Sequence, residues 1–361
     1  MLARIKLYIL ANYRNNFIIL EYLRLRTHLT LRQRAKYFDG YVDDFIKSNS
    51  RTDSRTLNFS YNNAISPPTY GDFFSVLMLV RFLALSGYKM SFSILDYSRR
   101  ESWTPLTTEE QARFISDQMS LARYLLPADV RIEFLDAQTS VSSNLSETAE
   151  NRIGDVFLAS GRALYVESSY FLQCLITKYG WEIPDGFLLR EPTRVQDVPC
   201  VAWHVRRGRS DQRRNSSKIS IKNDFRQLRA LYPNHDIKLF SDESGLEFAF
   251  SALTGSRQIK AYWDDNVRVM PQSAKGYIEA IQEVISTDFY FQRSGGGMGM
   301  VPIFSSMAYV ILCEDATSFY GRSFYGRRKN FLVPWATKSQ IFHYVLGDIE
   351  SYPMKKFIKP D

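Results

Sequence analysis

The stretch Val201-Ala202-Trp203-His204-Val205-Arg206-Arg207-Gly208 lies near the middle of the chain and gives the strongest indication of its fold. Cys200 to Val205 is a short apolar run with β-branched and aromatic members, which is typical of a buried strand. The run ends in two arginines and a glycine. Ligands of open α/β sheets bind at the carboxyl edge, so this strand would deliver guanidinium groups to a ligand site. An edge strand with solvated arginines is the alternative interpretation.

The two arginines suit a diphosphate ligand. A guanidinium group is always charged, and its planar fork holds two oxygens at once. His204 lies two residues before Arg206, so in a strand both side chains project to one face. The pattern therefore predicts an anion site that includes His204, Arg206 and Arg207.

A second candidate anion site follows a later apolar strand, Thr287 to Gln292. It is the run Arg293-Ser294-Gly295-Gly296-Gly297-Met298-Gly299-Met300, which leads into an apolar stretch, Val301 to Met307, that predicts a helix. Glycines let backbone amides approach an anion closely, and a helix N-terminus favours negative charge. The run is not a Walker A loop, because no lysine follows at the required place. It predicts phosphate contacts from Ser294, Gly295, Gly296 and Gly297, and a close-packed strand-to-helix turn is the alternative.

His204-Val205-Arg206-Arg207 resembles the HxRR core of the first motif of α1,6- and α1,2-fucosyltransferases, which has a looser relative in the protein O-fucosyltransferases. The resemblance implies a GT-B fold in which this motif opens the domain that binds GDP-fucose. It also implies that Arg206 takes the place of the essential arginine that holds the diphosphate. These families usually carry an acidic residue two positions beyond the second arginine, where this chain has Arg209.

Two further stretches resemble later motifs of the same families. Asp236 to Phe240 predicts a strand that ends in Ser241-Asp242-Glu243, which is similar to the Ser-Asp end of the second motif. The third motif is a strand, a serine-containing turn and a helix, and its counterpart here is either the Ser294 run or Ser305-Ser306. The resemblance thus implies that Ser241, Asp242 and one of these serines, Ser294 or Ser305, bind the donor.

Helices and strands alternate in both halves of the chain, which predicts an α/β protein with two Rossmann-like parallel-sheet domains facing each other across a cleft. The resemblance implies that this architecture is of GT-B type. The clearest unit in the first half is strand Leu57–Tyr61, helix Phe73–Leu85 and strand Met90–Leu95. We expect a helical segment over residues 1–55, an acceptor domain over 56–190 and a nucleotide-sugar-binding domain over 196–361. Residues 338–346 predict a closing helix, which could pack back on the first domain.

Composition limits the classes of partner. The chain has 361 residues and a formal charge of +8, from 46 basic and 38 acidic residues. This charge suits an anionic ligand, a membrane surface or nucleic acid. The basic residues are not confined to one helix and no nucleic-acid-binding module is recognisable, so a nucleic-acid partner is not expected. A non-enzymatic binder of anions remains the competing class.

The ends of the chain and its cysteines bear on location. Residues 1–31 are apolar but interrupted by arginine and lysine, which predicts an amphipathic helix rather than a signal peptide or a membrane span. That helix would either lie at the inner face of an anionic membrane or pack on its own domain. Cys174, Cys200 and Cys313 are scattered in apolar surroundings, which is typical of reduced core cysteines in a cytoplasmic protein.

Sugar transfer from a nucleotide diphosphate requires a stabilised leaving group, a positioned acceptor hydroxyl and often a base. Arg206 and Arg207, with the glycine amides, could stabilise the diphosphate without a metal or another cofactor. Asp72, in the turn before the first Rossmann helix, is the first candidate base, ahead of Glu167 and Glu147. These residues, taken with the resemblance, predict a metal-independent glycosyltransferase with a glycan or glycolipid acceptor. The resemblance implies GDP-fucose as its donor, and another nucleotide sugar is the alternative.

Overall fold

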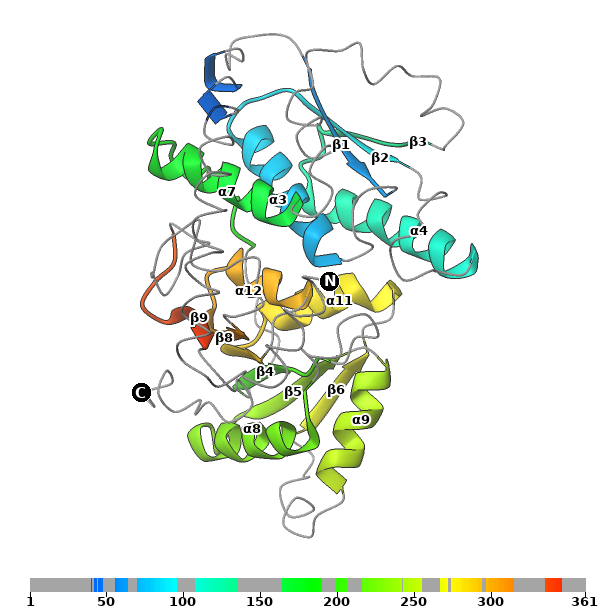
Figure 1. The fold of residues 1–361 in the computed structure, drawn as a ribbon, viewed down its shortest axis with the longest axis vertical. Helices are drawn as coiled ribbons and strands as arrows, with labels where there is room; N and C mark the ends of the chain where they lie inside the picture. The colour runs from blue at the N-terminus through cyan, green and yellow to red at the C-terminus, as the bar shows by residue number, and fades with distance from the viewer. Residues whose placement is uncertain are drawn as a thin grey trace, which may run out of the picture. The chain divides into compact units, whose positions relative to one another are not determined.

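A computed structural model describes the following parts of the chain: residues 40, 42–43, 45–47, 56–63, 70–95, 108–135, 164–189, 199–206, 216–241, 243–254, 267–271, 274–293, 297–314 and 335–345. The described residues fall into two compact units, one within Lys36–Arg190 and the other within Glu191–Asp361. Each unit is an α/β structure built on one parallel sheet (Figure 1). The cleft between two domains and the helix over residues 1–31 stay predictions.

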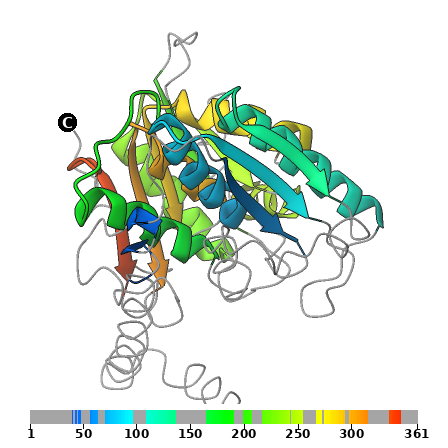
Figure 2. The same ribbon diagram turned by 90° about the horizontal axis from the view of Figure 1, so that it is seen from above.

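The first unit has three parallel strands in the order β1-β2-β3, seen side by side in Figure 2. Its elements are β1 (Leu57–Asn62), α3 (Tyr70–Leu85), β2 (Met90–Leu95), α4 (Thr108–Leu125), β3 (Arg131–Leu135) and α7 (Leu164–Thr177). Helix α3 is apolar on nearly every side, and contacts the sheet as well as α4 and α7. A helix of this composition is stable only in an interior. Its side chains from Phe73 to Leu83 are accordingly buried, apart from the half-buried Arg81.

The second unit has six parallel strands in the order β6-β5-β4-β7-β8-β9. The strands are β4 (Cys200–His204), β5 (Asp236–Ser241), β6 (Val267–Pro271), β7 (Phe289–Arg293), β8 (Ala308–Glu314) and β9 (Gln340–Val345). They are connected by α8 (Lys218–Leu231), α9 (Glu243–Thr254), α11 (Ala274–Ile285), the 3₁₀ turn η3 (Gly297–Gly299) and α12 (Met300–Ile303).

The path of the chain puts helices on both faces of this sheet. From β4 the chain adds β5 and β6 on one side through α8 and α9, then returns through α11 to place β7 on the other side of β4. Right-handed crossovers in opposite directions lie on opposite faces. Figure 1 shows α8 and α9 on one face and α11 and α12 on the other.

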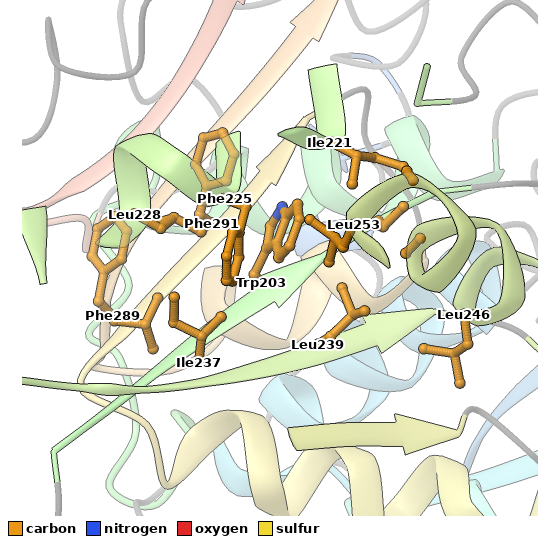
Figure 3. Packing of buried hydrophobic residues seen from close by; sticks show 14 of the residues in the cluster. Trp203, Ile221, Phe225, Leu228, Ile237, Leu239, Leu246, Leu253, Phe289 and Phe291 are labelled. Carbon is orange, nitrogen blue, oxygen red and sulfur yellow. The ribbon is translucent and has the colours of Figure 1, made fainter. Parts of the chain in front are cut away.

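The face under α8 and α9 holds the main apolar core (Figure 3). Trp203 of β4 lies at its centre and packs against Phe225 of α8, with ring centroids 6.1 Å apart. Phe291 of β7 and Leu239 of β5 flank it in the same cluster. Because the indole is almost fully buried, truncating Trp203 to alanine would cost about 3–5 kcal/mol.

Two sequence-based expectations for the second unit need correction. Residues 338–346 are not a helix: Gln340–Val345 is the edge strand β9, paired in parallel with β8. The helix expected over 301–307 is only the single turn Met300–Ile303, preceded by η3. The strand beside β5 is β6, Val267–Pro271.

Candidate functional site

The strand order of the larger sheet reverses between β4 and β7. The chain that leaves β4 turns to the α8 face, and the chain that leaves β7 turns to the face of α11 and α12. Such a switch point opens a crevice at the carboxyl ends of the two strands, where open α/β sheets bind ligands. His204 ends β4 and is paired in register with Gln292, near the end of β7. The HxRR stretch and the glycine run, which lie about 90 residues apart in sequence, thus start from neighbouring strand ends.

The alternation of side chains divides this edge into two groups. Trp203, Phe291 and Arg293 face α8 and α9, as their membership of the apolar core or their contact with α8 shows. His204 and Gln292 occupy the alternate positions and therefore face α11 and α12.

His204 is a neutral side chain in a buried position. Its residue surface is 6% exposed, and burial lowers its pKa to about 3, with the nearby charge of Arg206 acting in the same direction. The imidazole is therefore uncharged at pH 7 and offers hydrogen bonds rather than positive charge. Its Nδ1 has no hydrogen-bond partner among the described residues. Positive charge for an anion has to come from the arginines that follow.

Arg206 is half-buried, two residues past the end of β4. The backbone N–H of Val205 donates to Phe240 O at 2.9 Å, which keeps the chain on β5 for one residue beyond the strand. The carbonyl of Arg206 then accepts from Ser216 N–H at 3.0 Å. Residues 207–215, which include Arg207, lie outside the described part, but both ends of that segment are joined by this hydrogen bond.

The loop returns to a well-capped helix. Ser217 is the N-cap of α8, and its hydroxyl accepts from Ser220 N–H at 3.1 Å. This cap accounts for the start of α8 at Lys218.

Ser241 ends β5 at the same edge of the sheet. It is buried, and its Oγ has no hydrogen-bond partner among the described residues. Asp242 follows immediately and lies outside the described residues. The Ser-Asp stretch is thus placed one strand away from the end of β4.

Gln292 is a site residue that the sequence analysis did not single out. It is completely buried, and its Oε1 accepts from the Tyr290 hydroxyl at 2.6 Å. Its Nε2 has no partner among the described residues. The available signal was a glutamine near the end of an apolar strand, Phe289–Arg293.

Gly299 makes room for that glutamine. A Cβ at Gly299 would lie 2.5 Å from the Gln292 Oε1, closer than real side chains approach. Its φ of −63° is ordinary, so the close contact, and not the backbone conformation, favours glycine here. One glycine of the run therefore serves packing at the switch point.

Arg293, the next residue of β7, ties the glycine run to α8. Its Nε donates to Asp224 Oδ2 at 2.9 Å, and its second terminal nitrogen pairs with Oδ1. The guanidinium also lies 5.7 Å from the ring centroid of Phe291. The pair holds the end of β7 on α8, and residues 294–296 lie outside the described part. Gly297 begins η3 immediately after them.

Ser305 is not brought to this edge. The turn at α12 carries the chain back to the start of β8, so Ser305 lies at the amino-terminal edge of the sheet. Its hydroxyl donates to Pro302 O at 3.0 Å and accepts from Met307 N–H at 3.3 Å. Its carbonyl accepts from Gln340 Nε2 at 2.9 Å. These contacts give it a structural role in the turn.

The candidate bases belong to the other unit or lie outside the described residues. Asp72 is the third residue of α3, because the helix begins at Tyr70 rather than at Phe73. It follows the carboxyl end of β1 and so lies at the carboxyl edge of the smaller sheet. Glu167 lies in α7, and Glu147 is outside the described residues.

The described residues give three further observations, on metal binding, membrane spans and cysteines. They contain no group of three His, Cys, Asp or Glu side chains placed to hold a metal ion. The helices among them are each too short or too polar to cross a bilayer. Cys174 and Cys200 are buried free thiols.

Comparison with known proteins gives a weak structural likeness only. No protein-family profile and no curated protein sequence matches the chain. A crystal structure of UDP-GlcNAc 2-epimerase from Neisseria meningitidis bound to UDP-GlcNAc superposes with a TM-score of 0.28 and 10% identity, over 73% of this chain and 83% of that one. The S. aureus MnaA–UDP co-structure gives a TM-score of 0.30 and 10% identity, over 71% of this chain and 78% of that one. Scores this low establish neither an activity nor a family.

Proposed function

We propose that this chain is a glycosyltransferase that binds a nucleotide sugar at the carboxyl ends of β4 and β7. The observation that carries the proposal is the register pairing of His204 with Gln292. It puts the two stretches with anion-binding character, HxRR and the glycine run, on adjacent strand ends at the switch point of a parallel sheet.

The arginines would act on the leaving group. As the bond between the sugar and the diphosphate breaks, negative charge grows on the diphosphate, so a bidentate guanidinium stabilises the transition state more than the bound donor. Arg206 is the first candidate for this contact, with Arg207 and the amides of Gly295, Gly296 and Gly297 beside it. Ser241 and Asp242 would contact the donor from the neighbouring strand end. Ser305 lies at the opposite edge of the sheet and is not among the proposed donor contacts.

The acceptor would be bound by the first unit. Asp72 is our candidate for the base that removes the proton from the acceptor hydroxyl, because it opens the helix after β1, where ligands of such sheets bind. The acceptor class that we propose is a glycan or glycolipid. We also propose a cytoplasmic location, with residues 1–31 contacting an anionic membrane face; deleting them should then move the protein out of the membrane fraction.

GDP-fucose is the donor that we propose first, on the resemblance of His204-Val205-Arg206-Arg207 to the HxRR motif. A donor-hydrolysis screen tests it: release of nucleoside diphosphate is measured with GDP-fucose, GDP-mannose, UDP-glucose and UDP-GlcNAc. Preferential consumption of GDP-fucose supports the proposal. Preference for another donor keeps the transferase and changes the sugar, whereas consumption of none contradicts it.

The competing function is non-enzymatic binding of anions, which the formal charge of +8 favours. A thermal-shift panel separates the two hypotheses. Stabilisation by micromolar nucleoside diphosphate supports the transferase, and stabilisation by oligonucleotides alone supports the binder.

A further inference from the structure

We propose that Gln292 and His204 together bind one hydroxyl group of the nucleotide sugar, with the Gln292 amide donating to that hydroxyl and the His204 imidazole accepting from it. This inference rests on the proposed function and adds a residue and a ligand group to it. Neither the arginines nor the glycine run supplies such recognition, because both act on the anionic part of the ligand.

The two side chains have complementary, unused hydrogen-bonding atoms on one face of the sheet. Gln292 Nε2 and His204 Nδ1 are buried and have no partner within the described parts of the chain. The residues are paired in register on adjacent parallel strands, whose backbones lie about 4.8 Å apart. A single oxygen atom that contacts both side chains fits this spacing. Buried polar atoms are costly unless something satisfies them, so a ligand atom here would gain the full benefit of both bonds.

The Gln292 amide is held in one orientation. The Tyr290 hydroxyl donates to Oε1, and burial raises the pKa of Tyr290 well above its ordinary value, with Tyr277 contributing, so the phenol keeps its proton. Gly299 leaves space for the same oxygen. These two contacts assign the oxygen end of the amide to the protein and leave the NH₂ end for a ligand. Such preorganisation lowers the entropic cost of binding.

The chemistry selects a hydroxyl over a phosphate oxygen. In the tautomer that we propose, with the proton on Nε2, the neutral imidazole presents a lone pair at Nδ1 that needs a donor, and Gln292 Nε2 needs an acceptor. A hydroxyl supplies both. A phosphate oxygen only accepts at pH 7, so it would satisfy the glutamine and leave its charge against the imidazole lone pair. A nucleotide sugar carries suitable hydroxyls on its ribose and on its transferable sugar.

Gln292→Glu is the sharpest variant, because it keeps the side-chain volume and an oxygen for Tyr290 but replaces the NH₂ donor by an oxygen. Gly299→Ala is the second variant: its methyl group displaces the amide without changing Gln292. Tyr309→Phe is the matched control. Tyr309 is likewise a buried tyrosine, paired in register with Tyr290, two positions before the level of Gln292.

The test is isothermal titration of GDP, UDP, their 2′- and 3′-deoxy forms, GDP-fucose and UDP-GlcNAc into the wild-type chain and the variants. We expect Gln292→Glu to weaken binding of the preferred nucleotide about tenfold or more, Gly299→Ala to weaken it less, and Tyr309→Phe to leave it unchanged. If the bound hydroxyl belongs to the ribose, the wild-type chain and Gln292→Glu bind the corresponding deoxy nucleotide with equal affinity. If the bound hydroxyl belongs to the transferable sugar, Gln292→Glu has lower affinity than the wild-type chain for the nucleotide sugar but the same affinity for GDP and UDP.

Two results separate failure of this inference from failure of the proposed function. If the wild-type chain binds a nucleotide and both Gln292→Glu and Gly299→Ala bind it equally well, the hydroxyl assignment is wrong while the nucleotide site stands. If the wild-type chain binds none of these nucleotides, the proposed function is contradicted and the inference falls with it. Thermal unfolding of each variant identifies any that fails to fold, and Tyr290→Phe, which frees the amide, then takes the place of that variant.

Discussion

Arg293 and Asp224 form a buried two-point ion pair that joins the end of β7 to α8, with side chains only 3% and 4% exposed. The pair thereby links the segment that starts the glycine run to the helix that follows the HxRR loop. Taking two charges out of water is costly, and only good geometry with further hydrogen bonds offsets the cost. The contact is therefore expected to be sensitive to loss of either partner.

Replacing Asp224 by asparagine should lower the free energy of unfolding of the second unit by about 3–5 kcal/mol, because a buried guanidinium loses its counter-charge. Denaturant unfolding measures the change. Lys178→Met is the control, since its ion pair with Asp43 is exposed on both sides and should be worth less than about 1 kcal/mol. Similar small losses in both variants would show that the buried pair has no special role.

Replacing Lys238 and replacing Glu283 should change the stability of the protein by different amounts. The Lys238 ammonium is buried in β5 and donates to the Glu283 carboxylate of α11 at 2.6 Å. Glu283→Gln leaves the ammonium without a counter-charge and should cost about 3 kcal/mol, whereas Lys238→Met removes the buried charge and should cost little or stabilise. Thermal unfolding of the two variants provides the comparison. The opposite order of stabilities would refute this account of the pair.

Burial of His204 should make the free energy of unfolding fall as the pH is lowered below 6.5. Its pKa falls from 6.5 to about 3 on folding, so the contribution of the neutral imidazole is complete above pH 6.5 and is lost as the pH falls towards 3. Over that window the unfolded chain binds a proton that the native chain does not, which gives a slope of up to about 1.4 kcal/mol per pH unit. In His204→Gln this slope should disappear. A stability difference between the two proteins that stays constant from pH 7 to pH 4.5 would contradict the prediction.

Tyr309→Phe should be neutral or stabilising. The Tyr309 hydroxyl is buried without a hydrogen-bond partner among the described residues, and burial raises its pKa above the ordinary value. Removing an unsatisfied buried hydroxyl recovers a desolvation cost of about 1–3 kcal/mol. The thermal midpoint is the measurement, with Tyr290→Phe as the contrasting variant because its hydroxyl is bonded to Gln292. A clear loss of stability in Tyr309→Phe would mean that the hydroxyl has a partner.

Local sequence patterns predict much of the fold. Strand β2 has the bounds expected from its sequence, Met90–Leu95, and helix α3 ends at the expected Leu85. Gln340–Val345 shows the limit: it is predicted to be helical, yet it is the edge strand β9. Its isoleucine, valine and aromatic residues do favour a strand. The parallel pairing with β8 fixes these residues as a strand, and this tertiary contact cannot be seen from local sequence propensity.

The sequence predicts which strand ends form the candidate site, but not which side chains contact each other there. An apolar strand that ends in Arg-Arg-Gly indicates a carboxyl edge from sequence alone. Recognition of Gln292 depends on Tyr290 and Gly299 approaching the same oxygen, and Gly299 is separated from it by the turn after β7. The position of Ser305 depends on the short length of α12, because a longer helix was expected from a continuous apolar pattern.

The central claim is that Arg206 stabilises a departing diphosphate, and nucleotide-sugar turnover by Arg206→Ala tests it most directly. The screen described above selects the donor, and release of nucleoside diphosphate is then followed for the wild-type chain, Arg206→Ala, Arg206→Lys and Arg209→Ala. We expect Arg206→Ala to lose on the order of 3 kcal/mol of transition-state stabilisation, which is more than a hundredfold in rate. Arg206→Lys should also be severely impaired, because it keeps the charge and loses the fork. Arg209→Ala should be milder. Near-normal turnover by a folded Arg206→Ala, together with loss of activity in Arg209→Ala, would contradict the claim.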